Sequence, residues 1–169
     1  WVWLQREGLL APRPGDGGNW VFITRRGQQI ASPELLKAYR HANSLPKAQL
    51  HPVIAQKVWA TYLRGDYDTA VFQSFKELEV RTREFANLEP TDIGMDLMRK
   101  AFKPSSGPLS DTSTLTGEQE ALMHLMAGAI GSYKNPHSHR TVTIQAPEAV
   151  EMIVLASHLL RIVDKRGSV

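Results

Sequence analysis

Residues 67–85 read YDTAVFQSFKELEVRTREF, and this stretch decides the fold class. Its apolar side chains recur every three or four residues, which places them on one face of an α-helix. The face is formed by Ala70, Val71, Phe75, Leu78 and Thr82, and it is extended by Phe85. The stretch therefore predicts a long helix with one side buried.

The segments on either side repeat the helical pattern. Apolar spacing and end signals predict further helices over residues 51–65, 93–102, 118–132 and 147–165. His124 and His158 fall within these apolar patterns, so we expect them to be packed or half-buried. Residues 103–116 are rich in Pro, Ser, Gly and Thr, and so long a loop is expected to be functional or mobile. Residues 46–169 thus predict a mainly α fold, a bundle of about five helices.

Residues 1–45 predict a different and smaller unit. A helix end leads into a short strand by residue 10, residues 11–19 (APRPGDGGN) form a turn, and residues 20–24 (WVFIT) form a second strand. Arg25, Arg26 and Gly27 are expected to turn the chain again. Ser32 as N-cap and Pro33 at the first helical position then predict a helix to about residue 41.

This order of elements resembles the second half of a winged helix-turn-helix domain. The resemblance covers about 30 residues. The helices that enter a DNA groove in such domains would lie before Trp1. Because the chain begins at Trp1 and not at a methionine, we expect that further sequence precedes it.

The composition argues against disulfide-bonded, thiolate-metal and membrane-spanning proteins. The 169 residues are 42% hydrophobic and include no cysteine, which excludes disulfides and thiolate metal sites. No apolar run approaches the roughly 18 residues that span a bilayer, and no signal peptide is visible. We therefore expect a cytoplasmic protein with no membrane contact.

Charge is unevenly distributed along the chain. Residues 1–50 carry seven Lys or Arg and three Asp or Glu, a balance of +4, whereas residues 51–169 carry thirteen and fourteen, a balance of −1. A basic N-terminal part is typical of contact with an anionic partner, which could be DNA or RNA bound through Arg13, Arg25 and Arg26. The alternative is that a short segment carries this charge by chance.

The densest group of reactive side chains is the segment YKNPHSHR at residues 133–140. Pro136 prevents simple continuation of the preceding helix, so these polar groups are displayed at a helix end. A histidine can move protons near neutral pH, and a nearby cation can stabilise the extra negative charge of a phosphoryl transition state. Together they suffice for attack of a ribose 2′-hydroxyl on the adjacent phosphate, which is chemistry that RNA allows and DNA does not.

Residues 133–140 have two alternative interpretations. A polar loop with two histidines is often plain solvated surface. His137 and His139 could also bind zinc, but the lack of cysteine and of adjacent acidic residues makes a metal site the weaker interpretation.

The segment from Lys134 to His139 resembles the motif of HEPN proteins, which place an Arg, four to six residues and a His at the junction of two long helices. Here Lys stands where the motif has Arg, with four residues between it and His139. More of residues 50–165 is similar to one branch of that superfamily, the Ymh-like proteins. The similar segments are Gly65–Val71, Leu78–Arg81, Gly94–Met98 with Ala101 and Phe102, Gly128–Gly131, and the Asn-Pro-x-x-His-Arg element.

The resemblance implies a metal-independent endoribonuclease without a cofactor, of the kind found in toxin and antiphage defence systems. It implies that His139 transfers protons, that Lys134 stabilises the phosphate and that Asn135 orients them, while His137 and Arg140 contribute to RNA binding. Lysine keeps the charge of the motif's arginine but loses its planar fork, so Arg140 could supply the missing guanidinium.

HEPN-like proteins also pair two such motifs across a two-fold axis, which implies a homodimer with Gly128 and Gly131 allowing close approach. The alternative is a non-catalytic module that binds nucleic acid and dimerises. Glu77, Glu79, Arg81 and Arg83 could form a polar network under the motif, but ordinary solvated pairs are the favoured interpretation.

Overall fold

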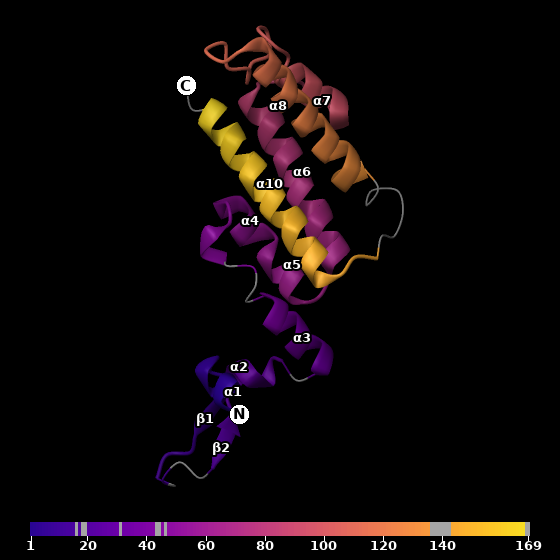
Figure 1. The fold of residues 1–169 in the computed structure, drawn as a ribbon. Helices are drawn as coiled ribbons and strands as arrows, with labels where there is room; N and C mark the ends of the chain where they lie inside the picture. The colour runs from indigo at the N-terminus through magenta and orange to yellow at the C-terminus, as the bar shows by residue number, and fades with distance from the viewer. Residues whose placement is uncertain are drawn as a thin grey trace.

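A computed structural model describes residues 1–15, 17, 20–30, 32–42, 45, 47–135 and 143–167. Figure 1 shows a helical bundle with a smaller N-terminal unit at one end, and the β-hairpin of that unit points away from the bundle. The mainly α fold predicted from the sequence is confirmed. Among the described residues, no helix is long and apolar enough to cross a membrane.

The N-terminal unit begins with a short helix and a two-stranded antiparallel sheet. Helix α1 (Val2–Arg6) leads into β1 (Leu10–Pro12), which pairs with β2 (Val21–Ile23) in the register Leu10↔Ile23 and Pro12↔Val21. The predicted hairpin is therefore confirmed. Three of its large apolar side chains, Trp20, Phe22 and Ile23, are exposed.

The prediction of a turn at Arg25–Gly27 is wrong. These residues belong to helix α2 (Arg25–Gln28), and the Thr24 side chain caps the helix by accepting the Gly27 N–H at 3.1 Å. A threonine at the N-cap satisfies one of the free N–H groups of the first turn, which favours helix over turn at this point. Arg25 and Arg26 thus lie at the start of a helix and not at the tip of a wing.

Helix α3 (Pro33–Ala42) connects the N-terminal unit to the bundle. The predicted cap is confirmed, since Ser32 Oγ accepts the Leu35 N–H at 3.1 Å. The helix packs against α5 (Trp59–Leu63) and contacts α10 (Ala146–Gly167). A short 3-10 turn, η1 (Lys47–Gln49), then leads into the first helix of the body, α4 (Pro52–Lys57).

The body is built around α6 (Tyr67–Phe85) and α10, which lie side by side along most of their length (Figure 1). Helices α7 (Gly94–Ala101) and α8 (Thr116–Ala129) pack against each other on the side of α6 away from α10. The predicted apolar face of α6 is buried as expected, with Phe85 half-buried at its end. Other large side chains of this core are Tyr62, Leu97, Met98, Phe102, Met126 and Ile153.

Two expectations about the body are wrong. The single helix expected over residues 51–65 is broken at Val58, whose φ of −108° separates α4 from α5. Neither Gly nor Pro marks this break, and Ile54, Val58 and Tyr62, which lie before, at and after it, are all buried in the core. His124 and His158 are exposed and not packed, because they lie on the outer faces of α8 and α10.

Candidate functional site

Helix α8 ends in an irregular turn that positions Lys134. The chain continues from α8 into a π-helical turn, η2 (Ile130–Lys134), and stays helical through Asn135, beyond the predicted end at Ser132. Within this turn Tyr133 stacks on Phe75 of α6 with ring centroids 5.2 Å apart. A Cβ on Gly131 would come within 2.8 Å of the Met95 sulfur, so this glycine permits α7 to approach. Packing on two neighbouring helices thus holds the turn in place.

Lys134 is directed at a buried carboxylate. Its Nζ lies 2.8 Å from Oε2 of Glu79, a residue of α6 that is only 5% exposed. The same Oε2 accepts the backbone N–H of Gly94 at 2.9 Å, and Oε1 accepts a hydrogen bond from Arg83 Nη2 at 3.1 Å. We call Glu79, Arg83 and Lys134 the Lys134 cluster. The expectation of solvated pairs is therefore wrong for Glu79 and Arg83.

The Lys134 cluster joins three helices around one charge. Glu79 and Arg83 are one turn apart on α6, Gly94 begins α7, and Lys134 ends η2. Arg83 also donates to the Asp92 carbonyl at 2.9 Å, which ties the segment before α7 to α6. One carboxylate and two cations sum to a formal charge of +1. A buried carboxylate needs such partners, because an unpaired one would be strongly destabilising.

The structure describes only some of the other residues that are predicted for the site. Residues 136–142 lie outside the described residues, and with them His137, His139 and Arg140. Asn135 is half-buried directly after Lys134. Arg13, Arg25 and Arg26 are exposed and belong to the N-terminal unit, which lies at one end of the bundle (Figure 1).

Sequence reasoning missed the pairing of Glu79 with Lys134. The spacing of Glu79 and Arg83 is visible in the sequence as an i,i+4 pair of opposite charge. The third member lies 55 residues later on another helix, and no local pattern connects them. The available signal is Glu79 itself, a charged residue next to Leu78 on the face of α6 that is buried.

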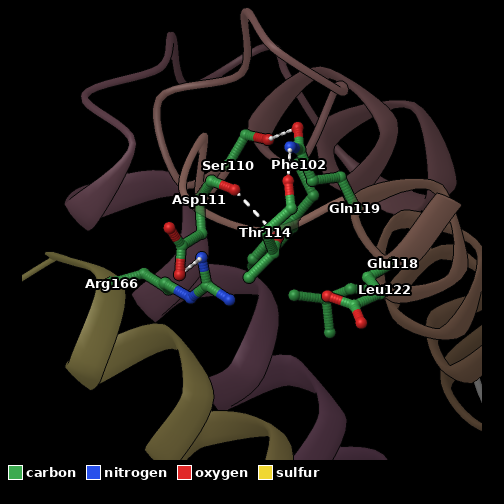
Figure 2. A pocket seen from close by; sticks show the side chains of 8 residues that line it. All are labelled: Phe102, Ser110, Asp111, Thr114, Glu118, Gln119, Leu122 and Arg166. Carbon is green, nitrogen blue, oxygen red and sulfur yellow. Dashed lines mark hydrogen bonds and ion pairs between the residues drawn. The ribbon is translucent and has the colours of Figure 1, made fainter. Parts of the chain in front are cut away.

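The loop between α7 and α8 borders a small cavity of about 150 Å³ that is lined by both polar and apolar residues (Figure 2). Gln119 fastens this loop, since its side chain accepts from Ser105 N at 2.8 Å and donates to the Thr114 carbonyl at 2.8 Å. Asp111 pairs with Arg166 of α10 at 2.8 Å. These polar groups already bond to one another and hold the loop against the bundle. The cavity is therefore a weak candidate for a ligand-binding site.

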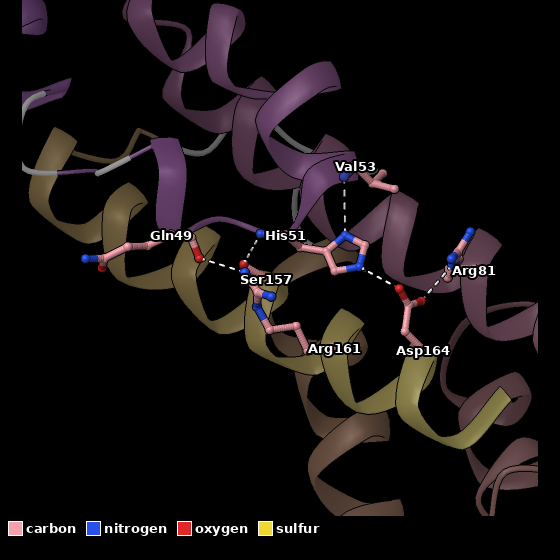
Figure 3. A network of polar contacts seen from close by, with 7 residues as sticks. All are labelled: Gln49, His51, Val53, Arg81, Ser157, Arg161 and Asp164. Carbon is pink, nitrogen blue, oxygen red and sulfur yellow. Dashed lines mark hydrogen bonds and ion pairs between the residues drawn. The ribbon is translucent and has the colours of Figure 1, made fainter. Parts of the chain in front are cut away.

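A second polar network fastens the start of the body to α10 (Figure 3). His51 Nδ1 accepts the Val53 N–H at 3.3 Å, which leaves Nε2 to donate to Asp164 Oδ2 at 2.9 Å. Asp164 Oδ1 accepts from Arg81 Nε at 2.8 Å, and Ser157 Oγ accepts the His51 N–H at 2.7 Å. The backbone N–H and both ring nitrogens of His51 thus have partners within the protein. We therefore assign this network a structural role.

We expect this network to make stability depend on pH through Asp164. Burial raises the pKa of Asp164, but hydrogen bonds from Arg81 and His51 outweigh burial and leave the pKa below its usual value. The stabilisation is therefore present above about pH 4 and is lost as the pH falls through the lowered pKa. Asp164→Asn should lower the free energy of unfolding by about 1 kcal/mol at pH 7, because the pair is partly exposed, and by less near pH 3.

Urea unfolding at the two pH values measures this difference. Asp66→Asn is the matched control, since Asp66 pairs with Arg64 at 3.3 Å on the surface and should change stability by under about 0.5 kcal/mol. An equal loss for Asp164→Asn at pH 7 and pH 3 would contradict the assignment.

Among the described residues, no group of three or more His, Cys, Asp or Glu side chains is arranged to hold a metal ion. A family model described as "Protein of unknown function (Hypoth_ymh)" matches residues 48–163, which takes in the Lys134 cluster and the whole segment 133–140. Comparisons with curated proteins and with solved structures found no match.

Proposed function

The chain belongs to this family of unknown function, and we propose that it is a metal-independent endoribonuclease of the HEPN type. The observation that carries the proposal is Lys134, a cation held by Glu79 at a helix end directly before the segment that contains His137 and His139. The HEPN resemblance of that segment supplies the reaction. A toxin or antiphage effector acting in the cytoplasm is the role proposed from the same resemblance.

The proposed reaction uses the ribose 2′-hydroxyl as nucleophile. His139 takes the 2′ proton as the 2′-oxygen bonds to phosphorus, and the bond from phosphorus to the 5′-oxygen breaks. The leaving 5′-oxygen takes a proton from a second histidine. The products are a 2′,3′-cyclic phosphate and a 5′-hydroxyl. Lys134 faces the charge that develops on the phosphate, while Asn135 orients the two groups and His137 and Arg140 hold the RNA.

In this proposal Glu79 does not contact the RNA but positions the Lys134 side chain. A lysine side chain has four rotatable bonds, and an ion pair with a buried carboxylate limits its positions before RNA arrives. Arg83 shares the carboxylate, so the Lys134 cluster keeps a formal charge of +1 for the phosphate. In this proposal the ion pair with Glu79 positions Lys134 to take the role that arginine has in the HEPN motif.

Cleavage of labelled RNA in excess chelator tests the proposal. We expect cleavage of RNA but not of DNA with the same sequence, no inhibition by EDTA, and fragments that end in 2′,3′-cyclic phosphate. Cleavage that requires a divalent metal, or fragments ending in a 3′-hydroxyl, would contradict the mechanism.

A homodimer is part of the proposal, because one motif offers one His139 and the reaction uses both a base and an acid. A surface on α8 supports the homodimer as its interface. There Leu125 is 46% exposed, and a Cβ on Gly128 would meet open space. Gly131, also expected at the interface, instead packs on Met95 within the chain.

We expect light scattering at micromolar concentration to give the mass of a dimer. Leu125→Glu should shift the mass to that of a monomer, since a buried unpaired carboxylate opposes association. Leu115→Glu is the matched control, because Leu115 is 75% exposed at the other end of the same helix. A monomeric parent protein would contradict the dimer.

The second candidate function is a non-catalytic module that binds DNA or RNA and dimerises. Exposed Arg13 and Arg25 lie on the same small unit as the exposed aromatic residues Trp20 and Phe22 of its hairpin. Cations that contact phosphates combined with aromatic rings that stack on bases are typical of nucleic-acid binding. Salt-sensitive binding without cleavage in the assay above would favour this function.

A further inference from the structure

A cavity lies where the N-terminal unit meets the body, between α2, α3 and α5. Its volume is about 350 Å³, within the range of small-molecule pockets. The described side chains that line it include two arginines, two aromatic rings and no acidic residue. They are Arg26, Gln29, Ile30, Leu35, Tyr39, Trp59, Leu63 and Arg64.

Trp59 contributes a hydrogen-bond donor without an acceptor. Its Nε1 is buried, and within the described part of the chain it has no hydrogen-bond partner. Buried donors are rarely left unpaired, because the N–H has lost its water. Lys47 Nζ lies 4.7 Å from the centre of the Trp59 ring and adds a positive charge beside it. Because Nε1 has no surface open to solvent, other atoms of Trp59 line the cavity.

Tyr39 supplies a second aromatic plane that its neighbours hold in place. The Tyr39 hydroxyl donates to Glu7 Oε2 at 3.0 Å, and the edge of the ring meets Trp3 with centroids 6.3 Å apart. The Arg26 guanidinium lies 5.4 Å from the centre of the Tyr39 ring. A flat aromatic group in the cavity would thus meet a ring, aliphatic side chains and an arginine.

Arg64 completes the cationic lining. It bonds to Asp66 at 3.3 Å and to Thr61 Oγ1 at 3.2 Å, and its side chain is 61% exposed. Such surface pairs contribute little and are readily exchanged for a stronger partner. A phosphate is such a partner, because the guanidinium fork matches two of its oxygens.

We propose that this cavity binds a free mononucleotide. The base lies among Tyr39, Ile30, Leu35 and Leu63, and the phosphate is held by Arg26 and Arg64. Two cations together with aromatic and aliphatic surface in one cavity of this size match that ligand class. None of these residues belongs to the Lys134 cluster, so the proposal does not depend on ribonuclease activity.

Calorimetric titration of the full chain with AMP and GMP tests the proposal, with adenosine and inorganic phosphate as partial ligands. We expect at least one mononucleotide to bind with a micromolar dissociation constant, and each partial ligand to bind at least about tenfold more weakly. Arg64→Ala should weaken nucleotide binding about tenfold. Arg99→Ala is the matched control, because Arg99 is also exposed and paired with a nearby aspartate, Asp96, at 2.8 Å.

The proposal is overturned if neither nucleotide binds at millimolar concentration, or if adenosine alone binds as tightly. Binding confined to a 5′-phosphorylated pentanucleotide would also overturn it and assign the cavity to a strand end.

Discussion

His139→Ala is expected to reduce RNA cleavage by about 10²–10⁴-fold, the usual contribution of a general acid or base. If both copies in a dimer supply His139, the substitution removes base and acid together, which places the loss near the upper end. Initial cleavage rates at equal protein concentration measure the effect. Expression in a bacterial host gives a second readout, because a toxin role requires growth arrest by the parent and none by the variant.

Two further histidine variants control for this result. His158→Ala removes an exposed histidine of α10 outside the motif and should leave the rate unchanged. His137→Ala should weaken RNA binding, seen as a raised KM, with a smaller change in kcat. Equal cleavage by His139→Ala and the parent would reject the catalytic assignment, and the nucleic-acid-binding module would take its place.

Lys134→Ala is expected to lower cleavage by about 10²–10³-fold, the usual loss when one charge-stabilising donor is removed. It should also destabilise the fold, because Glu79 is buried and loses one of its partners. Arg83 and the Gly94 N–H remain, so the loss is that of one hydrogen bond between charged groups, about 2 kcal/mol. For a chain of this length that corresponds to roughly 4–8 °C in the unfolding temperature.

Lys134→Arg separates catalysis from stability. Arginine can reach Glu79 and present a planar fork, so cleavage should equal or exceed that of the parent while the unfolding temperature is retained. Lys57→Ala is the matched control, since Lys57 pairs with Glu77 of α6 at 2.7 Å but is solvent-exposed. It should change neither readout by much.

One result would assign Lys134 a purely structural role. In that result the Lys134→Ala protein is less stable than the parent, yet it cleaves RNA as fast as the parent at a temperature where it remains folded. In that case Lys134 would serve only to neutralise Glu79, and the cation of the reaction would have to be another residue of the motif segment.

Elements set by local signals could be predicted from the sequence. The bounds of α6, Tyr67–Phe85, were predicted to the residue, because its apolar repeat begins after Gly65 and persists for five turns. Ser32 and Pro33 marked the start of α3, and the Gly-rich turn between two β-branched segments marked the hairpin. In each case the residues that decide the conformation lie within a few positions of one another.

Only the tertiary structure revealed the break at Val58, the packing of Gly131 on Met95 and the pairing of Glu79 with Lys134. The sequence by itself determined that a long helix carries Glu79 and that a helix ends near Lys134. Which carboxylate meets which cation depends on how α6, α7 and α8 pack. That packing is governed by apolar surfaces distributed over the whole chain, so a polar pair 55 residues apart leaves no local pattern.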